Sequence, residues 1–80
     1  MKVRLLAFAR VREVLGFGER IVDLPAGATA RDAWYAAGAA GALDSLSSST
    51  RLARNGVVVD GSARLSDGDE VALLPPVGGG

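Results

Sequence analysis

Carboxylates and glycines are the residues of this 80-residue chain whose types and spacing could support chemistry. The sequence contains no histidine and no cysteine, which removes the usual side chains for acid–base catalysis, thiol nucleophiles and most transition-metal sites. A serine nucleophile would lack a histidine base, and Lys2 is the only lysine. We therefore expect that the chain is not an enzyme on its own and that it holds no metal.

One cluster of acids, SDGDE at residues 66–70, could bind a metal or serve general acid–base catalysis. Its Asp67-Gly68 pair is common in turns, so the pattern favours a solvated turn that leads into a strand. The GFG segment at residues 16–18 lacks the rest of a phosphate-binding motif, and we interpret it as a turn as well.

The segment LLPPVGGG, residues 73–80, offers a different reactive group, the α-carboxylate of Gly80. Glycine has no side chain, so a glycine tip can enter a channel that is too narrow for other residues. Pro75 and Pro76 favour an extended exit, and six extended residues reach roughly 20 Å. We expect the Gly80 carboxylate to be the functional group; a frayed terminus or a cloning linker is the alternative.

Hydrophobic periodicity places this tail after the last of five expected strands. Alternation and turn residues predict strands at 2–8, 19–24, 51–54, 57–59 and 70–74. A short helix is expected at residues 9–16, and Thr29 opens a main helix with an apolar stripe of Ala30, Ala33, Trp34 and Ala37. Residues 43–50 read as a polar loop that Leu43 and Leu46 anchor.

This order predicts an α+β fold in which a mixed sheet of about five strands wraps over one main helix. The first and last strands are expected to be neighbours near the centre of the sheet. We expect one domain over residues 1–80, with residues 74–80 as an extended functional tail.

The alternation also predicts which side chains face away from the helix. Val3, Leu5, Ala7, Val71 and Leu73 are expected inward, together with Val22 and Leu24 of the second strand. The opposite face would carry Leu6, Phe8, Ala72, Leu74 and Val58. Arg12 falls beside Phe8. An apolar patch at the root of a thin tail is typical of a docking surface.

Composition disfavours two other classes of protein. Nine basic and nine acidic residues balance, and the arginines are spread from Arg4 to Arg64, unlike the clustered basic excess of nucleic-acid binders. No apolar run approaches the ~20 residues of a membrane-spanning helix. Charges interrupt the N-terminal apolar residues, which argues against a signal peptide. We expect a soluble cytoplasmic protein.

Four segments in this order, FARVREVLG, LPAGAT, ARNGVVV and LSDGDEVALLPPVGGG, resemble the ubiquitin-like sulfur carriers of the MoaD/ThiS family. The match is closest to the small subunits of molybdopterin synthase. The resemblance covers nearly the whole chain, and its most specific part is DGDEVALLPPV with the terminal glycines. It implies the β-grasp fold, which agrees with the element order.

The resemblance also implies a mechanism. An E1-like enzyme that uses ATP adenylates the Gly80 carboxylate, and a persulfide sulfur then replaces the adenylate to give a thiocarboxylate. The tail donates this sulfur to cyclic pyranopterin monophosphate in the large synthase subunit. Two small and two large subunits would form a heterotetramer. No cofactor is bound by the chain itself, because the partner enzyme uses the ATP.

Residue roles carry over by position. Gly80 would bear the sulfur and Gly79 would give clearance, whereas the partner-binding residues would be Phe8, Arg12, Val58, Leu74, Pro75, Pro76, Val77 and Gly78. Gly78 stands where the family commonly has serine, threonine or another small residue. Other sulfur pathways (thiamine thiazole, cysteine or tRNA thiolation) and a ubiquitin-like modifier or interaction domain without sulfur transfer stay open as alternatives.

Overall fold

A computed structural model describes residues 1–38 and 51–74 of the chain. Two helices and five strands occur in these ranges, in the order β1 (Lys2–Ala7), α1 (Ala9–Leu15), β2 (Glu19–Asp23), α2 (Ala30–Ala36), β3 (Arg51–Arg54), β4 (Val57–Val59) and β5 (Glu70–Leu74). This is the predicted order. The expected loop at 43–50, with Leu43 and Leu46, lies outside the described residues.

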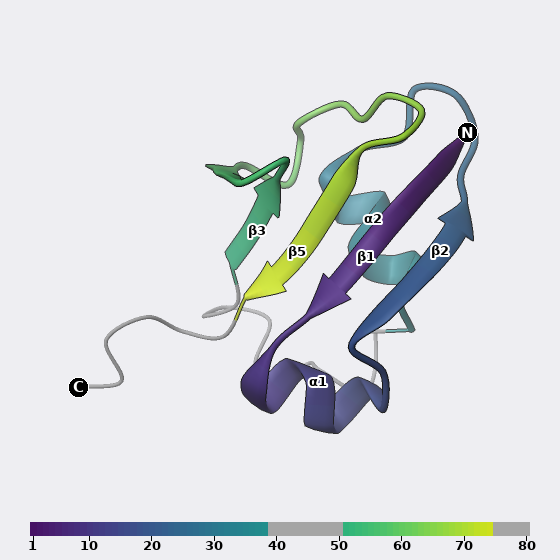
Figure 1. Cartoon of the computed structure of the whole chain (residues 1–80). Coiled ribbons are helices and arrows are strands. Elements are labelled where there is room, and N and C mark those ends of the chain that lie inside the picture. Colours follow the sequence, from purple (N-terminus) through teal and green to yellow (C-terminus); the bar gives the residue numbers. More distant parts are fainter. Residues whose placement is uncertain (39–50, 75–80) are drawn as a thin grey trace.

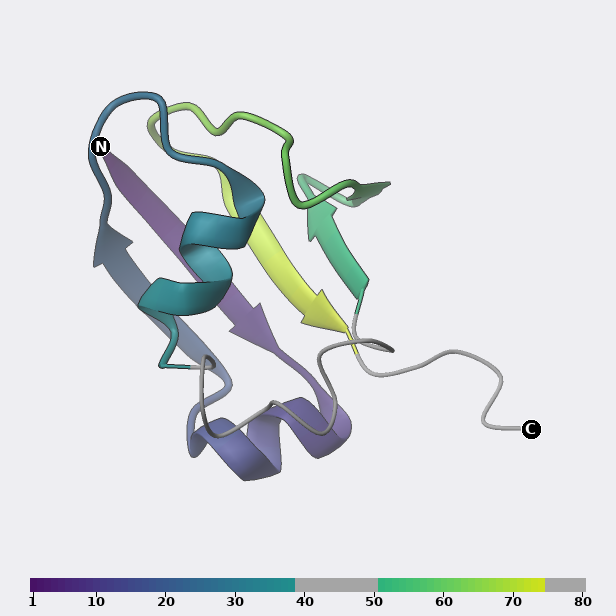
Figure 2. The same cartoon turned by 180° about the vertical axis from the view of Figure 1, so that it is seen from behind.

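The five strands form one mixed sheet in the order β2-β1-β5-β3-β4. β1 and β5 are parallel neighbours at its centre, and every other pair is antiparallel. α2 crosses one face of the sheet, and α1 lies at the carboxyl end of β1 (Figures 1 and 2). Because β1 and β5 run the same way, the chain leaves both strands at the same end of the sheet.

The core lies between the central strands and α2. Val3, Leu5, Val71 and Leu73 are fully buried, which confirms the predicted alternation. The α2 stripe packs onto them as expected, with Ala30, Ala33, Trp34 and Ala37 buried. Val22 is partly buried against this core and Leu24 is buried, so the inward face of β2 is also as predicted.

Element ends differ from the prediction by one residue at three places. β1 ends at Ala7 because Phe8, although extended at φ −127° and ψ 151°, is already the N-cap of α1. That helix ends at Leu15 because Gly16 takes the left-handed conformation at φ 82°. β2 ends at Asp23, and Leu24 beyond it still bonds to Met1: its N–H donates to the Met1 carbonyl at 2.9 Å, and its carbonyl accepts from the N-terminal ammonium group.

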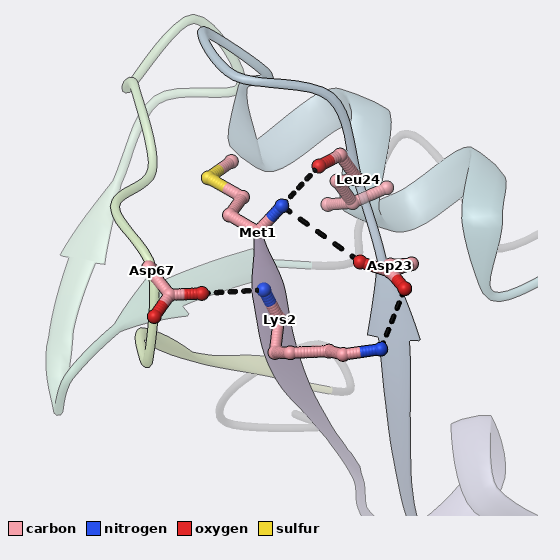
Figure 3. A network of polar contacts seen from close by, with 5 residues as sticks. All are labelled: Met1, Lys2, Asp23, Leu24 and Asp67. Carbon is pink, nitrogen blue, oxygen red and sulfur yellow. Dashed lines mark hydrogen bonds and ion pairs between the residues drawn. The ribbon is translucent and has the colours of Figure 1, made fainter.

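The amino end of β1 is held by a polar network (Figure 3). The Met1 ammonium group donates to the Leu24 carbonyl at 2.8 Å, and Lys2 Nζ contacts the Asp23 carboxylate at 2.5 Å. On the other side of the strand, the Lys2 backbone N–H donates to Asp67 Oδ1 at 2.7 Å. The SDGDE segment is therefore a turn, as predicted, with Gly68 at φ 87° and Asp67 bound to a strand backbone.

A capping box begins α2. The Thr29 hydroxyl accepts a hydrogen bond from the Asp32 N–H, and the Asp32 carboxylate accepts one from the Thr29 N–H at 2.8 Å. These two bonds satisfy backbone donors that the first helical turn leaves free. The same turn joins the rest of the fold through the Ala30 N–H, which donates to the Ala63 carbonyl at 2.8 Å.

Replacing this cap is expected to destabilise the protein measurably. Thr29→Ala removes the side-chain acceptor, and loss of such a cap typically costs about 1 kcal/mol. Urea unfolding is expected to show a lower midpoint with an unchanged m-value. Thr29→Ser keeps the hydroxyl oxygen and serves as the control. Equal midpoints for the alanine and serine variants would contradict the assignment of the cap.

Candidate functional site

The face of the sheet opposite α2 carries the predicted apolar side chains. Cross-strand register places Leu6 beside Ala72, Ala72 beside Ala53, and Ala53 beside Val58. Paired residues share a face, so this row runs across four strands. Within residues 1–38 and 51–74 no helix covers it (Figure 1). We call these residues, together with Phe8 and Leu74, the outer patch.

Exposure within the outer patch follows the prediction. Phe8 is 45% exposed and Val58 57% exposed, and Leu6, Ala72 and Leu74 are half-buried. Ala53 is buried in the row although it faces outward, because its small side chain lies between two paired strands. The outer patch therefore leaves large apolar groups in water, which is the property of an interaction surface.

The half of the same face that lies toward the amino ends of β1 and β5 carries charged side chains that pair with one another. Arg4 Nε contacts Glu19 Oε2 at 2.5 Å, and Arg4 also lies 3.9 Å from the Glu70 carboxylate. The hydrogen bond from Lys2 lowers the pKa of Asp23. Surface ion pairs of this kind contribute little to stability, because water screens them. They divide the face into a self-paired charged half and an apolar half.

The predicted tail begins beside the apolar half. Leu74 is the last residue of β5, and the parallel pairing brings this end of β5 to the end of β1, where Phe8 follows. Pro75, Pro76, Val77, Gly78, Gly79 and Gly80 lie outside the described residues. Their predicted roles therefore stay predictions, whereas the neighbourhood of Phe8 and Leu74 at the tail root is a feature of the fold.

Arg12 lies one helical turn beyond Phe8, and its side chain rests on Gly18. A Cβ atom added to Gly18 would lie 3.1 Å from Arg12 Cζ and Nε, so a larger residue there would push this guanidinium aside. Phe17, the residue between Gly16 and Gly18, has its ring stacked against Arg20, whose Cζ lies 4.1 Å from the ring centroid. The GFG segment was interpreted only as a turn, and its function of positioning Arg12 was missed because no local pattern encodes that contact.

The hairpin that carries Val58 is joined to the start of β5. Its turn is the predicted Asn55-Gly56, with φ of 50° and 87°. Asn55 Nδ2 donates to Asp69 Oδ1 at 3.0 Å, and the Glu70 N–H donates to Asn55 Oδ1 at 2.9 Å. The Ser66 N–H donates to Asp69 Oδ2 at 2.7 Å. Asp69 thus links two turns and holds the hairpin against the central strand.

These hydrogen bonds give Asp69 a pH-dependent part in stability. The hydrogen bond from the Asn55 side chain has the largest effect and lowers the pKa of Asp69 below its ordinary value. The hydrogen bond from the Ser66 N–H acts in the same direction. The contribution is present above the unfolded pKa of about 4 and is lost as the pH falls through the lower folded value. Asp69→Ala is therefore expected to destabilise the protein at pH 7, and this difference is expected to shrink below about pH 4.

Urea titrations at several pH values measure this difference. Asp60→Ala is the matched control, because the Asp60 carboxylate accepts no hydrogen bond among the described residues. A difference between wild type and Asp69→Ala that stays constant down to pH 2 would contradict the role of the ionised carboxylate.

In the described ranges, no helix is long and apolar enough to cross a bilayer.

The mixed five-stranded sheet wrapped over one main helix is the ubiquitin-like β-grasp, as predicted. The model of the ThiS family matches residues 5–80, and the chain belongs to that family. A Chlamydomonas reinhardtii protein named molybdopterin synthase sulfur carrier subunit is 40% identical over 83 residues, which cover the whole of both chains.

Two solved structures agree with this assignment. SAMP1 from Haloferax volcanii is 31% identical, covers all of both chains and superposes with a TM-score of 0.85. A putative molybdopterin converting factor, subunit 1, from Pyrococcus furiosus is 30% identical over 96% of this chain and 99% of its own, with a TM-score of 0.80. The fold and the family resemblance predicted from the sequence are therefore confirmed.

Proposed function

We propose that this protein is the sulfur-carrier subunit of a molybdopterin synthase. The observation that carries the proposal is the full-length similarity to the Chlamydomonas sulfur carrier subunit, within a family match over residues 5–80. The outer patch at the root of the tail supports it, because a carrier needs a surface for docking and a thin segment for insertion.

The reactive group in this proposal is the α-carboxylate of Gly80. A carboxylate is a poor electrophile, so an E1-like partner first joins it to AMP from ATP and releases pyrophosphate. The terminal sulfur of a persulfide then attacks the acyl carbon, and AMP leaves with its bonding electrons. A thiol cleaves the remaining S–S bond and leaves a thiocarboxylate on Gly80. The sulfur is carried on the main chain, which agrees with a sequence that contains no cysteine.

The carrier acts with partners and binds no cofactor of its own in this proposal. The large synthase subunit contacts Phe8, Arg12, Val58 and Leu74 and encloses the segment from Pro75 to Gly80, with Gly79 giving clearance. There the thiocarboxylate donates sulfur to cyclic pyranopterin monophosphate. Two small and two large subunits form the complex, and the activating enzyme brings the ATP. We place these reactions in the cytoplasm, with no nucleic acid and no membrane involved.

A second candidate function is protein modification, because SAMP1, whose full name is small archaeal modifier protein 1, is a structural neighbour at 31% identity. In this case the Gly80 carboxylate would form an amide with a lysine of a target protein. Lys2 is the only lysine of the chain, and it is paired with Asp23 at 2.5 Å. If copies of this protein were joined to one another through lysine side chains, Lys2 would therefore be the only lysine available for the bond.

Reconstitution separates the carrier of this pathway from the other candidates. Protein bearing a Gly80 thiocarboxylate is mixed with the large synthase subunit and cyclic pyranopterin monophosphate. We expect molybdopterin to form and the carrier to return to the carboxylate. Thiocarboxylate that transfers sulfur only to a thiazole, cysteine or tRNA system would assign the protein to that pathway. Lysine conjugates without sulfur transfer would support the modifier function.

A further inference from the structure

A second surface of the molecule lies between α2 and the β4 edge of the sheet, and Val58 of the outer patch borders it. It is a groove of about 470 Å³. Trp34 and Tyr35 line it from α2, and Leu52 and Val59 line it from the paired strands β3 and β4. Figure 2 shows α2 in front of the sheet with the β3–β4 hairpin beside it. Its volume is within the range of ligand sites, about 300–1,000 Å³.

One wall of the groove is the edge of the sheet. β4 is last in the strand order, and among the described residues its only strand neighbour is β3. The strand consists of three valines, of which Val57 is 65% exposed. Edges without charges or prolines are ready to pair with an added strand. The groove therefore offers both main-chain groups and apolar contacts to an extended segment.

The charges along the groove are predominantly positive. Arg31 lines it from α2 and Arg51 from β3, whereas Asp60 is the one acidic residue in the lining that the structure describes. No ion pair joins either arginine to a carboxylate in residues 1–38 and 51–74. An occupant with carboxylates would therefore complement the groove.

Arg31 is held at its position by the backbone. Its N–H donates to the Gly61 carbonyl at 2.9 Å, and its guanidinium lies against the Cα of Gly61. A Cβ atom at Gly61 would come within 3.0 Å of Arg31 Nε and Nη2. Glycine at this position therefore leaves room for the arginine beside the end of β4. A substitution there moves the charge with little effect on the core, since the neighbour is a flexible side chain.

We propose that the groove between α2 and β4 binds an extended, acidic segment of a partner protein. The segment adds a strand to the free edge of β4 and lays apolar side chains over Tyr35 and Val59, which are more exposed than the buried Trp34. Its carboxylates pair with Arg31 and Arg51. Because Val58 borders both surfaces, the segment approaches the outer patch but does not occupy it. The proposal does not depend on sulfur transfer by Gly80.

A direct test uses the full chain and the blocked pentapeptide Glu-Val-Ile-Val-Glu as the probe. Trp34 is the only tryptophan, so its fluorescence reports on the groove. We expect saturable binding with a Kd below about 1 mM that weakens with added salt. The peptide Lys-Val-Ile-Val-Lys is expected to bind at least about tenfold more weakly, because its charges repel the arginines. Glu-Val-Pro-Val-Glu is expected to lose binding, because proline removes a ladder donor.

Variants locate the peptide. Arg31→Glu is expected to weaken binding at least about threefold, and Gly61→Ala is expected to weaken it in the same direction by displacing Arg31. Arg10→Glu, at an exposed position on α1, is the control and is expected to bind as wild type. Melting curves show whether each variant is folded, and the backbone amide resonances of β4 are expected to shift on binding.

Three results would overturn the proposal. The first is equal affinity for the glutamate and lysine peptides. The second is a set of resonance shifts that falls on Leu6 and Leu74 in place of β4, which would place the peptide on the outer patch. The third is binding of free glutamate as tightly as the peptide, which would make the groove a site for small anions.

Discussion

A chain that lacks Gly79 and Gly80 is expected to fold as the full chain does and to accept no sulfur. Within residues 1–38 and 51–74, every buried core residue lies between Val3 and Leu73, and glycine has no side chain to bury, so we expect that packing does not need the two glycines. Removing them is expected to change the free energy of unfolding by well under ~1 kcal/mol, as for surface substitutions. The loss of sulfur loading, by contrast, is expected to be complete. The terminal carboxylate then belongs to Gly78, and the shortened tail no longer carries it into the site of the activating enzyme.

The control for this truncation separates the position of the carboxylate from its mere presence. Gly80→Ala keeps a terminal carboxylate and adds one methyl group, so its loading measures how narrow the activating site is. Intact mass after incubation with the E1-like enzyme, ATP and a sulfur donor gives the loaded fraction of each protein. A truncated chain that is loaded as fully as wild type would exclude the glycine tip as the site. A large fall in melting temperature would show that the tail packs on its own domain.

The second large effect concerns docking. Leu74→Glu and Phe8→Glu are expected to fold and yet to bind the large synthase subunit poorly. Burial of one large apolar side chain contributes roughly 1.5–3 kcal/mol, or about ten- to a hundredfold in affinity. A carboxylate at either position would also be desolvated without a partner, which raises the loss further. Calorimetric titration against the large subunit measures the loss.

Two matched controls make this prediction specific. Leu73, one residue earlier in β5, is 0% exposed, and Leu73→Ala is expected to cost about 2–5 kcal/mol of stability. Ile21 is 65% exposed on edge strand β2, opposite Arg4 and away from the tail root, so Ile21→Glu is expected to leave binding unchanged. If Leu74→Glu and Phe8→Glu bind normally, docking uses another surface. If they unfold, these side chains belong to the core.

Much of the fold was predictable because its signals are local. Alternation over Val3, Leu5 and Ala7 identified the buried face of β1, since successive strand residues point to opposite sides. Thr29 with Asp32 marked the start of α2, and Asn55-Gly56 marked the hairpin, because each motif satisfies its own backbone. The outer patch followed from the same alternation once the element order implied a sheet with a single main helix.

Features that depend on contacts between distant segments were not predictable. Gly18 beside Arg12, and Gly61 beside Arg31, leave room for side chains from other elements. Ile21 on the outer face was also missed, although its alternation with Val22 was a usable signal. The groove beside β4 forms only when α2 lies across the sheet, so no stretch of sequence encodes it alone.

The most direct test of the account is the mass of the full chain after incubation with the E1-like enzyme, ATP and a sulfur donor. The account predicts a stable increase that matches replacement of one oxygen by one sulfur, located by fragmentation in the C-terminal peptide at Gly80. Oxidation of Met1, the only methionine, gives a similar increase and is recognised by its place in the N-terminal peptide. No increase at Gly80, or an equal increase on a chain without Gly79 and Gly80, would contradict the central claim.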